Sequence, residues 1–204
     1  MSYLVIVRHG QSQANIDGLI AGDLDTPLTE QGRIEARELA SLLMDIPFDA
    51  AYSSPLQRAR QTLEEIINTL HLLVTLTFDP DLRERSWGIL EGKYSDNRNT
   101  DFTVEEQALW QTFDTAPSGG ESYADVSQRV SRNFDDHVLP RLKQGQNVLI
   151  VSHNSALKTL QRYLENIPEN QTHALGLRNA EAKIYRFENG KISLSATRSI
   201  HKKH

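Results

Sequence analysis

Near its start the chain reads Tyr3-Leu4-Val5-Ile6-Val7-Arg8-His9-Gly10, an unbroken apolar run that leads directly to a cation, an imidazole and a glycine. An apolar run of this kind, without alternation, is typical of a strand that is buried on both faces of a parallel sheet. In open α/β sheets, ligands bind at the carboxyl ends of such strands. The stretch therefore predicts an α/β fold in which Arg8 and His9 stand at a binding site.

Three later apolar runs, within residues 48–52, 74–78 and 147–152, are also followed by polar side chains. In chain order these side chains are Arg58, Glu84 and His153. Because parallel strands end at the same edge of a sheet, we expect these groups to lie close to the first pair. The sequence thus predicts one site made of two histidines, two arginines and a carboxylate.

The remaining pattern completes the expected architecture. Helical apolar spacing separates the apolar runs, as in α/β domains with a mostly parallel sheet. Asn189-Gly190, between residues 182–187 and 191–196, is a strong signal for a two-residue hairpin turn and predicts an antiparallel edge. Residues 86–120 are polar and irregular. We expect one domain over residues 1–204, a three-layer αβα sandwich with a mostly parallel central sheet, an antiparallel C-terminal edge and a helical lid insertion at 86–120.

The composition limits the classes of function. Of the 204 residues, 38% are hydrophobic and 24% charged, which is ordinary for a globular protein. The net charge of −5 argues against general nucleic-acid binding, and the absence of cysteine excludes disulfides and thiolate catalysis. No apolar stretch approaches the roughly 18 residues of a membrane helix, and the N-terminus shows no signal-peptide pattern. We expect a cytoplasmic protein that binds neither nucleic acid nor membrane.

The expected site has the groups that phosphoryl transfer needs. Arginine guanidinium groups match phosphate oxygens, a neutral imidazole is a nucleophile, and a carboxylate can protonate a leaving oxygen and then deprotonate water. The arginines can carry the charge of the transferred group, so no metal is expected, and neither HExxH nor GxxxxGK[ST] occurs in the chain. Each residue alone is more simply explained as an exposed charge or a buried histidine. The hypothesis depends on their joint placement.

Several motifs follow one another in an order that is typical of one family. They are Leu4-Val5-Ile6-Val7-Arg8-His9-Gly10-Gln11-Ser12 with Asn15, Asp25-Thr26-Pro27-Leu28-Thr29-Glu30-Gln31-Gly32, Ser53-Ser54-Pro55-Leu56-Gln57-Arg58-Ala59, Leu82-Arg83-Glu84-Arg85, Ser118-Gly119-Gly120-Glu121-Ser122 and Val151-Ser152-His153. In this set the chain resembles the histidine phosphatase superfamily, whose best-known branch is the cofactor-dependent phosphoglycerate mutases. The resemblance covers essentially the whole chain, and the ordered set is far more specific than any single motif.

The resemblance implies roles for the matching residues. His9 would be the phosphorylated nucleophile and Glu84 the general acid and base, while Arg8, Arg58 and His153 would hold the phosphoryl group. The other residues expected at the phosphate or the substrate are Gly10, Asn15, Gly22, Trp87 and Asn154. At Gly10 the missing Cβ would let the main chain approach the phosphate closely. No metal ligand is implied.

Departures from the mutase pattern bear on where the phosphoryl group goes. Mutases that resemble this chain have paired arginines at Gln111-Thr112, a lysine at Ser95, with Lys93 nearby here, and Gly-Asn at Asn154-Ser155. Trp87-Gly88-Ile89-Leu90-Glu91-Gly92 looks more like the phosphatase branch, whereas Leu157-Lys158 follows the mutases. Loss of the arginine pair would remove two charge-assisted contacts, each worth roughly 1.5–3 kcal/mol, that help to retain a bisphosphorylated intermediate.

We therefore predict a phosphatase that hydrolyses a small phosphomonoester through a phosphohistidine. The alternative is a 2,3-bisphosphoglycerate-dependent phosphoglycerate mutase, with 2,3-bisphosphoglycerate as primer; otherwise no cofactor is expected. A third hypothesis is a sensor or scaffold that binds a phosphorylated ligand without turnover, although the complete set of catalytic residue types argues against it. The expected partner is a small phosphorylated metabolite, and analogy with the family allows a homodimer.

Overall fold

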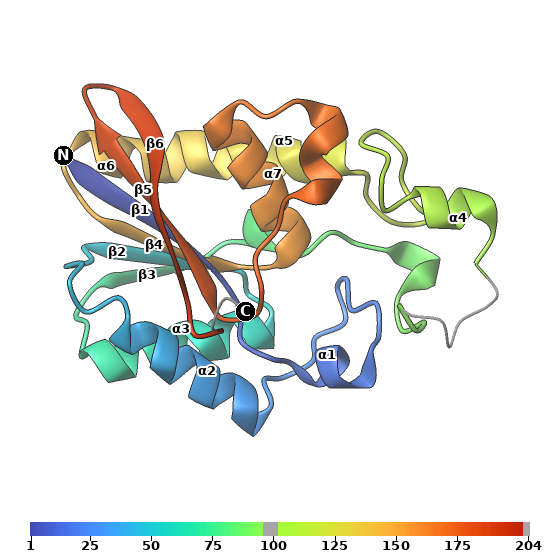
Figure 1. The fold of residues 1–204 in the computed structure, drawn as a ribbon, viewed down its shortest axis with the longest axis horizontal. Helices are drawn as coiled ribbons and strands as arrows, with labels where there is room; N and C mark the ends of the chain where they lie inside the picture. Colours follow the sequence, from blue (N-terminus) through green and yellow to red (C-terminus); the bar gives the residue numbers. More distant parts are fainter. Residues whose placement is uncertain (96–101, 202–204) are drawn as a thin grey trace.

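A six-stranded sheet with the order β3-β2-β4-β1-β5-β6 runs through the centre of the molecule (Figure 1). The computed structural model describes residues 1–95 and 102–201. The strands are β1 (Ser2–Arg8), β2 (Ala50–Ser53), β3 (Thr75–Phe78), β4 (Val148–Ser152), β5 (Glu181–Glu188) and β6 (Lys191–Ser199). The first four pair in parallel, and β5 and β6 pair antiparallel. The predicted mostly parallel sheet with an antiparallel C-terminal edge is confirmed.

The apolar run of β1 lacks alternation because both faces of this strand are covered. Leu4 and Ile6 belong to a core cluster on one side of the sheet. Val5 and Val7 belong to a second cluster on the other side. None of the four side chains is accessible to solvent. The sheet is therefore the middle layer of three.

Helices form the two outer layers (Figure 1). On one face lie α2 (Glu30–Ser41) and α3 (Gln57–Leu70), and on the other lie α5 (Tyr123–Asn133), α6 (Leu139–Lys143) and α7 (Asn154–Glu165). A π-helical turn, Phe134–Val138, joins α5 to α6. Short 3-10 turns occur at Pro80–Leu82, Gly88–Leu90 and Glu169–Ala174. The three-layer αβα sandwich is confirmed.

The β5–β6 hairpin has the tight turn that its sequence predicts. Asn189 and Gly190 both adopt positive φ, 52° and 75°, as a type I′ turn requires. The hairpin places β6 at the outer edge of the sheet, with β5 between it and β1.

The described parts of the segment expected to form a lid, residues 86–95 and 102–120, lie beyond the carboxyl ends of the parallel strands (Figure 1). In Figure 1 its helix α4 (Val104–Ala108) is to the right of the sheet, as is α1 (Gln13–Asp17). Trp87 and Leu90 pack with Ile20 in a separate apolar cluster. Residues 96–101 of this segment lie outside the described residues.

Among residues 1–95 and 102–201, no helix has the length and the apolar character needed to cross a membrane.

Candidate functional site

A cavity of about 290 Å³ opens at the carboxyl edge of the parallel strands. Most of the residues predicted for the site line this cavity: Arg8, His9, Asn15, Gly22, Arg58, Glu84, Trp87 and Asn154. The other two, Gly10 and His153, are not lining residues but are next in the chain to His9 and Asn154, which are. His153 is fully buried, and its ring centre is 5.1 Å from that of His9. The strand ends therefore bring together the groups that the sequence predicts to meet.

The His9 ring is buried and held at one nitrogen. Its Nδ1 lies 2.7 Å from the main-chain oxygen of Gly10. Because a carbonyl oxygen only accepts, Nδ1 carries the proton and Nε2 has a free electron pair. Burial, followed by the charges of Arg58 and Arg8, holds the pKa of His9 well below its usual value. The ring is thus a neutral imidazole at physiological pH.

His153 has the opposite arrangement. Arg58 Nε donates a hydrogen bond to its Nδ1 at 3.1 Å, so the proton of the neutral ring is on Nε2. Within the described part of the chain, that Nε2 has no hydrogen-bond partner. Burial, then the charge of Arg58, holds the pKa of His153 well below its usual value. His153 therefore presents an unused N–H donor beside His9.

The two arginines are fixed by main-chain oxygens. Arg58 donates to the oxygens of Leu24 and Gly22, at 2.7 and 2.8 Å. Arg8 donates to the oxygen of Leu177 at 2.8 Å, and its buried Nε has no partner among the described residues. Burial lowers the pKa of both, yet guanidinium groups stay protonated in proteins. Each has five N–H donors, so donors remain for a ligand.

Glu84 reaches the cavity from the loop after β3. Its carboxylate accepts the N–H of Ser155, in the first turn of α7, at 3.0 Å, and the N–H of Arg85 at 2.8 Å. The same helix begins with Asn154, whose Oδ1 accepts the N–H of Leu177 at 3.2 Å.

At Gly10 the structure gives a different reason for glycine than the predicted approach to phosphate. A Cβ here would lie 2.3 Å from the main-chain oxygen of Gly32, at the start of α2. The Gly10 N–H is already used, because it donates to Thr62 Oγ1 at 3.0 Å. Close packing of the β1 turn against α2 is therefore sufficient to require this glycine.

The amides on either side of Gly10 are used in the same way. The N–H groups of residues 9–12 donate in turn to Ser152 O, Thr62 Oγ1, Glu35 Oε2 and Asn15 Oδ1. The anion-binding capacity of this turn therefore resides in its side chains.

Some lining residues were not predicted. Lys158, Tyr123 and Ser155 face the cavity, and Lys158 Nζ donates to the oxygen of His173 at 2.7 Å. Burial lowers the pKa of Lys158. A signal for it exists in the sequence, because Lys158 follows Asn154 by four residues and so shares its helix face.

The positions that depart from the mutase pattern are divided between the cavity and the surface. Ser95 lines the cavity, but Gln111, Thr112 and Lys93 do not. Lys93 pairs with Glu106 at 3.7 Å. On that side the wall is aromatic, with the Trp87 and Trp110 rings 4.8 Å apart.

Chemically, the cavity can hold a tetrahedral anion. Arg8 and Arg58 line it together with His9, and His153 is packed beside His9, so these groups can donate to the anion's oxygens. Glu84 lines the same cavity and can exchange a proton with a bound ligand. Within residues 1–95 and 102–201, no group of three His, Asp or Glu side chains is placed to hold a metal ion.

Comparison with known proteins gives a consistent result. A model of the histidine phosphatase superfamily (branch 1) matches residues 4–199. A 2,3-bisphosphoglycerate-dependent phosphoglycerate mutase from Cytophaga hutchinsonii is 35% identical, over 98% of this chain and 94% of its own. The alpha-ribazole phosphatase from Shigella flexneri has a TM-score of 0.83 at 28% identity, covering 99% of this chain and 100% of that one. A mycobacterial glucosyl-3-phosphoglycerate phosphatase has a TM-score of 0.80 at 28% identity, covering 96% and 98%.

Proposed function

Because this chain belongs to the histidine phosphatase superfamily, we propose that it moves the phosphoryl group of a small phosphomonoester to His9 and then to water. Members of this family are phosphatases or phosphoglycerate mutases that act on small phosphorylated metabolites. The choice between the two activities depends on what surrounds the phosphorylated histidine.

In the first half-reaction the phosphate oxygens accept hydrogen bonds from Arg8, Arg58 and His153 Nε2. The electron pair on His9 Nε2 forms the new N–P bond as the P–O bond to the alcohol breaks. Glu84 gives its proton to the leaving oxygen, so that an alcohol departs. In the second half, the Glu84 carboxylate takes a proton from water and the water oxygen attacks phosphorus. The N–P bond breaks, its electron pair returns to His9 Nε2, and inorganic phosphate leaves a neutral His9.

The opposite tautomers of the two buried histidines carry this proposal. Gly10 O holds the proton of His9 on Nδ1, which leaves a nucleophilic Nε2. Arg58 Nε occupies Nδ1 of His153, which leaves a donor for a phosphate oxygen. A neutral nucleophile beside fixed cations is the electrostatic arrangement that phosphoryl transfer requires.

Transfer to water is favoured over transfer back to the organic product. A mutase must retain a ligand with two phosphates. Among the described residues, the cations that line the cavity are Arg8, Arg58 and Lys158. Since the first two hold the transferred group, one lysine remains for a second phosphate. The mutase stays the second candidate, because relatives such as that of Cytophaga hutchinsonii bear that name over almost the whole chain.

The test is incubation with 3-phosphoglycerate, with and without 2,3-bisphosphoglycerate, followed by phosphorus NMR. We expect inorganic phosphate from phosphomonoesters, an acid-labile phosphohistidine in the native protein, and none in His9→Ala. Formation of 2-phosphoglycerate far faster than free phosphate would make the protein a mutase. No phosphohistidine with any phosphomonoester would favour the sensor hypothesis. The assays contain EDTA, because we propose an enzyme that needs no metal ion.

We also propose a cytoplasmic location, which the absence of cysteine supports.

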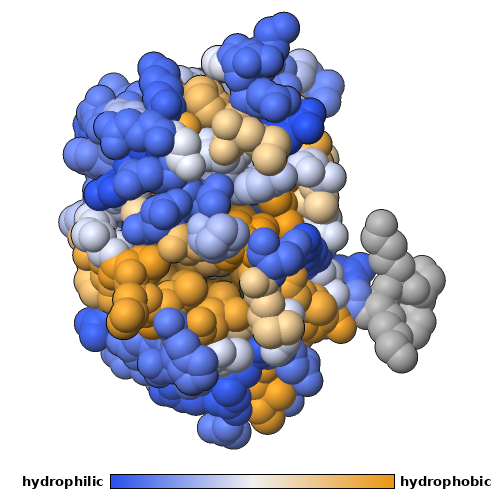
Figure 2. Space-filling view, turned by 90° about the vertical axis from the view of Figure 1, so that its left-hand side faces the viewer, coloured by the Kyte–Doolittle hydropathy of each residue, from blue (hydrophilic) through white to orange (hydrophobic). Residues whose placement is uncertain are grey.

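We also propose a homodimer that forms through β3. This strand is at the edge of the sheet, and its Leu76 and Phe78 are 43% and 44% exposed. Figure 2 shows a broad apolar area on the side of the molecule that faces away from α4. Exposed apolar edges favour pairing with another chain. Light scattering should give twice the chain mass for the native protein and the single mass for Phe78→Lys; a monomeric native protein would contradict the proposal.

A further inference from the structure

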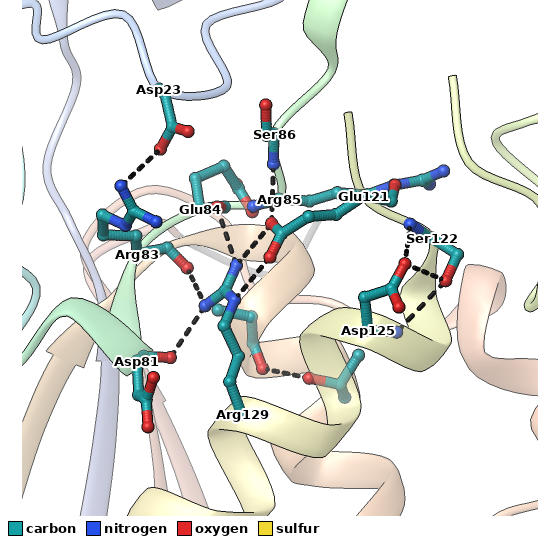
Figure 3. Close-up of polar contacts among 12 residues, drawn as sticks. Asp23, Asp81, Arg83, Glu84, Arg85, Ser86, Glu121, Ser122, Asp125 and Arg129 are labelled. Carbon is teal, nitrogen blue, oxygen red and sulfur yellow. Dashed lines mark hydrogen bonds and ion pairs between the residues drawn. The ribbon is translucent and has the colours of Figure 1, made fainter. Parts of the chain in front are cut away.

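A buried arginine of α5, Arg129, binds the main chain of the loop that carries Glu84 (Figure 3). Arg129 is 9% exposed, and each of its five N–H donors has an acceptor. Nη1 donates to the main-chain oxygens of Asp81 and Arg83, at 2.7 and 2.8 Å. Nη2 donates to the main-chain oxygen of Glu84, and Nη2 and Nε donate to the two carboxylate oxygens of Glu121, all at 2.9 Å.

Glu121 extends this contact to the other side of Glu84. Its Oε2 also accepts the N–H of Ser86, and its own N–H donates to the oxygen of Ser86, each at 2.9 Å. Burial acts to raise the pKa of Glu121, but hydrogen bonds from Arg129 and Ser86 hold that pKa below its usual value. The ion pair therefore fixes the main chain both before and after Arg85, the residue between Glu84 and Ser86.

The Glu84 carboxylate is held separately, by the N–H groups of Ser155 and Arg85. These two bonds orient the end of the side chain but do not place its Cα. We propose that Arg129 and Glu121 are positioning residues, which set the main-chain position from which Glu84 reaches the leaving oxygen. The inference rests on the proposed role of Glu84 as acid and base.

A buried arginine with five hydrogen bonds could also serve only to stabilise the fold, and the leaving group separates the two roles. An alkyl phosphate needs a proton on its leaving oxygen, whereas p-nitrophenolate leaves without one. A displaced Glu84 should therefore slow release of the alcohol from an alkyl phosphate and spare release of p-nitrophenol. A purely structural defect lowers the amount of active enzyme and affects both substrates equally.

The experiment measures the first-turnover rate of alcohol release from glycerol 2-phosphate and from p-nitrophenyl phosphate. In Arg129→Met we expect a loss of about 100-fold for the alkyl phosphate, the effect of a misplacement near 1 Å. For p-nitrophenyl phosphate we expect a loss below about tenfold, because its leaving group needs no acid catalysis. Glu84→Gln should show the same dependence on the leaving group, and the double variant should be no slower than Glu84→Gln alone.

Arg132→Met is the matched control. Arg132 is on the same helix and binds the same loop, through the side chain of Asp81 at 2.8 Å, but its own side chain is 58% exposed. We expect rates within about threefold of native for both substrates, because an exposed ion pair contributes little. Glu121→Gln is the second variant, should Arg129→Met not fold. It keeps the shape of Glu121 but turns one acceptor toward Arg129 or Ser86 into an N–H donor.

Equal losses for both substrates in folded Arg129→Met or Glu121→Gln, or additive losses in the double variant, would overturn the positioning role. If Glu84→Gln itself shows no dependence on the leaving group while the phosphohistidine still forms, the proposed role of Glu84 fails, and the positioning role with it. If no phosphohistidine forms in the native protein, the proposed function fails.

Discussion

Two buried histidines lie side by side at this site, and their neighbours give them opposite hydrogen-bonding roles. A carbonyl oxygen at Gly10 requires a proton on Nδ1 of His9, whereas the Nε–H of Arg58 requires an electron pair on Nδ1 of His153. Arg58 therefore acts in two ways, as a charge for a bound anion and as the group that selects the His153 tautomer.

Arg58→Ala should cost about 10²–10³ in kcat, the usual effect of removing one preorganised donor. Arg58→Lys should recover little of this, because an ammonium group cannot replace a planar fork that bonds Leu24, Gly22 and His153 together. Steady-state rates of phosphate release check both variants. A near-native rate for Arg58→Lys would mean that charge alone is sufficient.

The buried histidines also make stability depend on pH. Burial, then the charge of Arg58, holds both pKa values well below normal in the folded protein, whereas the unfolded chain binds these protons near about pH 6.5. The contribution of the two histidines to the free energy of unfolding should therefore be complete above about pH 6.5. It should decrease as the pH falls toward the folded pKa values, by up to about 1.4 kcal/mol per pH unit for each histidine. Urea unfolding of native protein and His9→Gln at about pH 7.5 and about pH 5.5 measures this. An unchanged pH dependence in His9→Gln would contradict it.

At the scale of elements, α3 holds the β1 turn through one hydroxyl. Thr62 Oγ1 accepts the Gly10 N–H at 3.0 Å and donates to the oxygen of Arg58 at 2.7 Å. Thr62 is fully buried, so it links the main chain beside His9 to the helix that carries Arg58.

Thr62→Val keeps the shape but leaves the Gly10 N–H without an acceptor. We expect a loss of about 1–3 kcal/mol in the free energy of unfolding, the penalty for a buried unsatisfied donor, together with a lower kcat. Thr62→Ser keeps the hydroxyl and is the control. Urea unfolding and phosphate release measure both variants. Equal free energies of unfolding and equal kcat values in Thr62→Val and Thr62→Ser would refute the role of this bond.

The elements and most of the site were predictable for one reason: an unbroken apolar run marks a buried parallel strand, and such strands deliver their next residues to one edge. Arg8, His9 and His153 follow directly from this rule. Tyr123 and Lys158 were missed because their orientation depends on how α5 and α7 rotate against the sheet. The packing reason for glycine at position 10 was missed, because it is a close contact with Gly32. Gly32 is distant in sequence, and only the packed structure shows that the two main chains approach each other.

For the molecule as a whole, the charge at the cavity is opposite in sign to the net charge of the chain. The chain has a net charge of −5, yet Arg8, Arg58 and Lys158 line the same cavity, and Glu84 is the one acidic side chain that lines it among the described residues. An anionic substrate is thus repelled by the protein at long range and attracted at short range. Its binding should be sensitive to screening.

We expect the KM for a phosphomonoester to fall between about 20 mM and about 200 mM salt, because salt screens the long-range repulsion by the net negative charge, whereas the attraction acts over a few ångströms, which is less than the Debye length. kcat should change less, since bound charges inside the cavity are poorly screened. A series of rate measurements in sodium chloride checks this. A KM that rises as salt is added would contradict this and would show that attraction by the cavity cations already acts at long range.

The amides of residues 9–12, all bonded within the protein, set this site apart from loops that bind phosphate with their main chain. A loop of that kind can be transferred to another protein, because a short peptide that keeps the loop conformation still binds the phosphate. Here the donors come from β1, α3 and the end of β4, so no short segment contains the binding site. The smallest part of the protein that can form this binding site is the assembled sheet with its flanking helices. The site can be altered by substitution, but it cannot be transferred to another protein by grafting one segment.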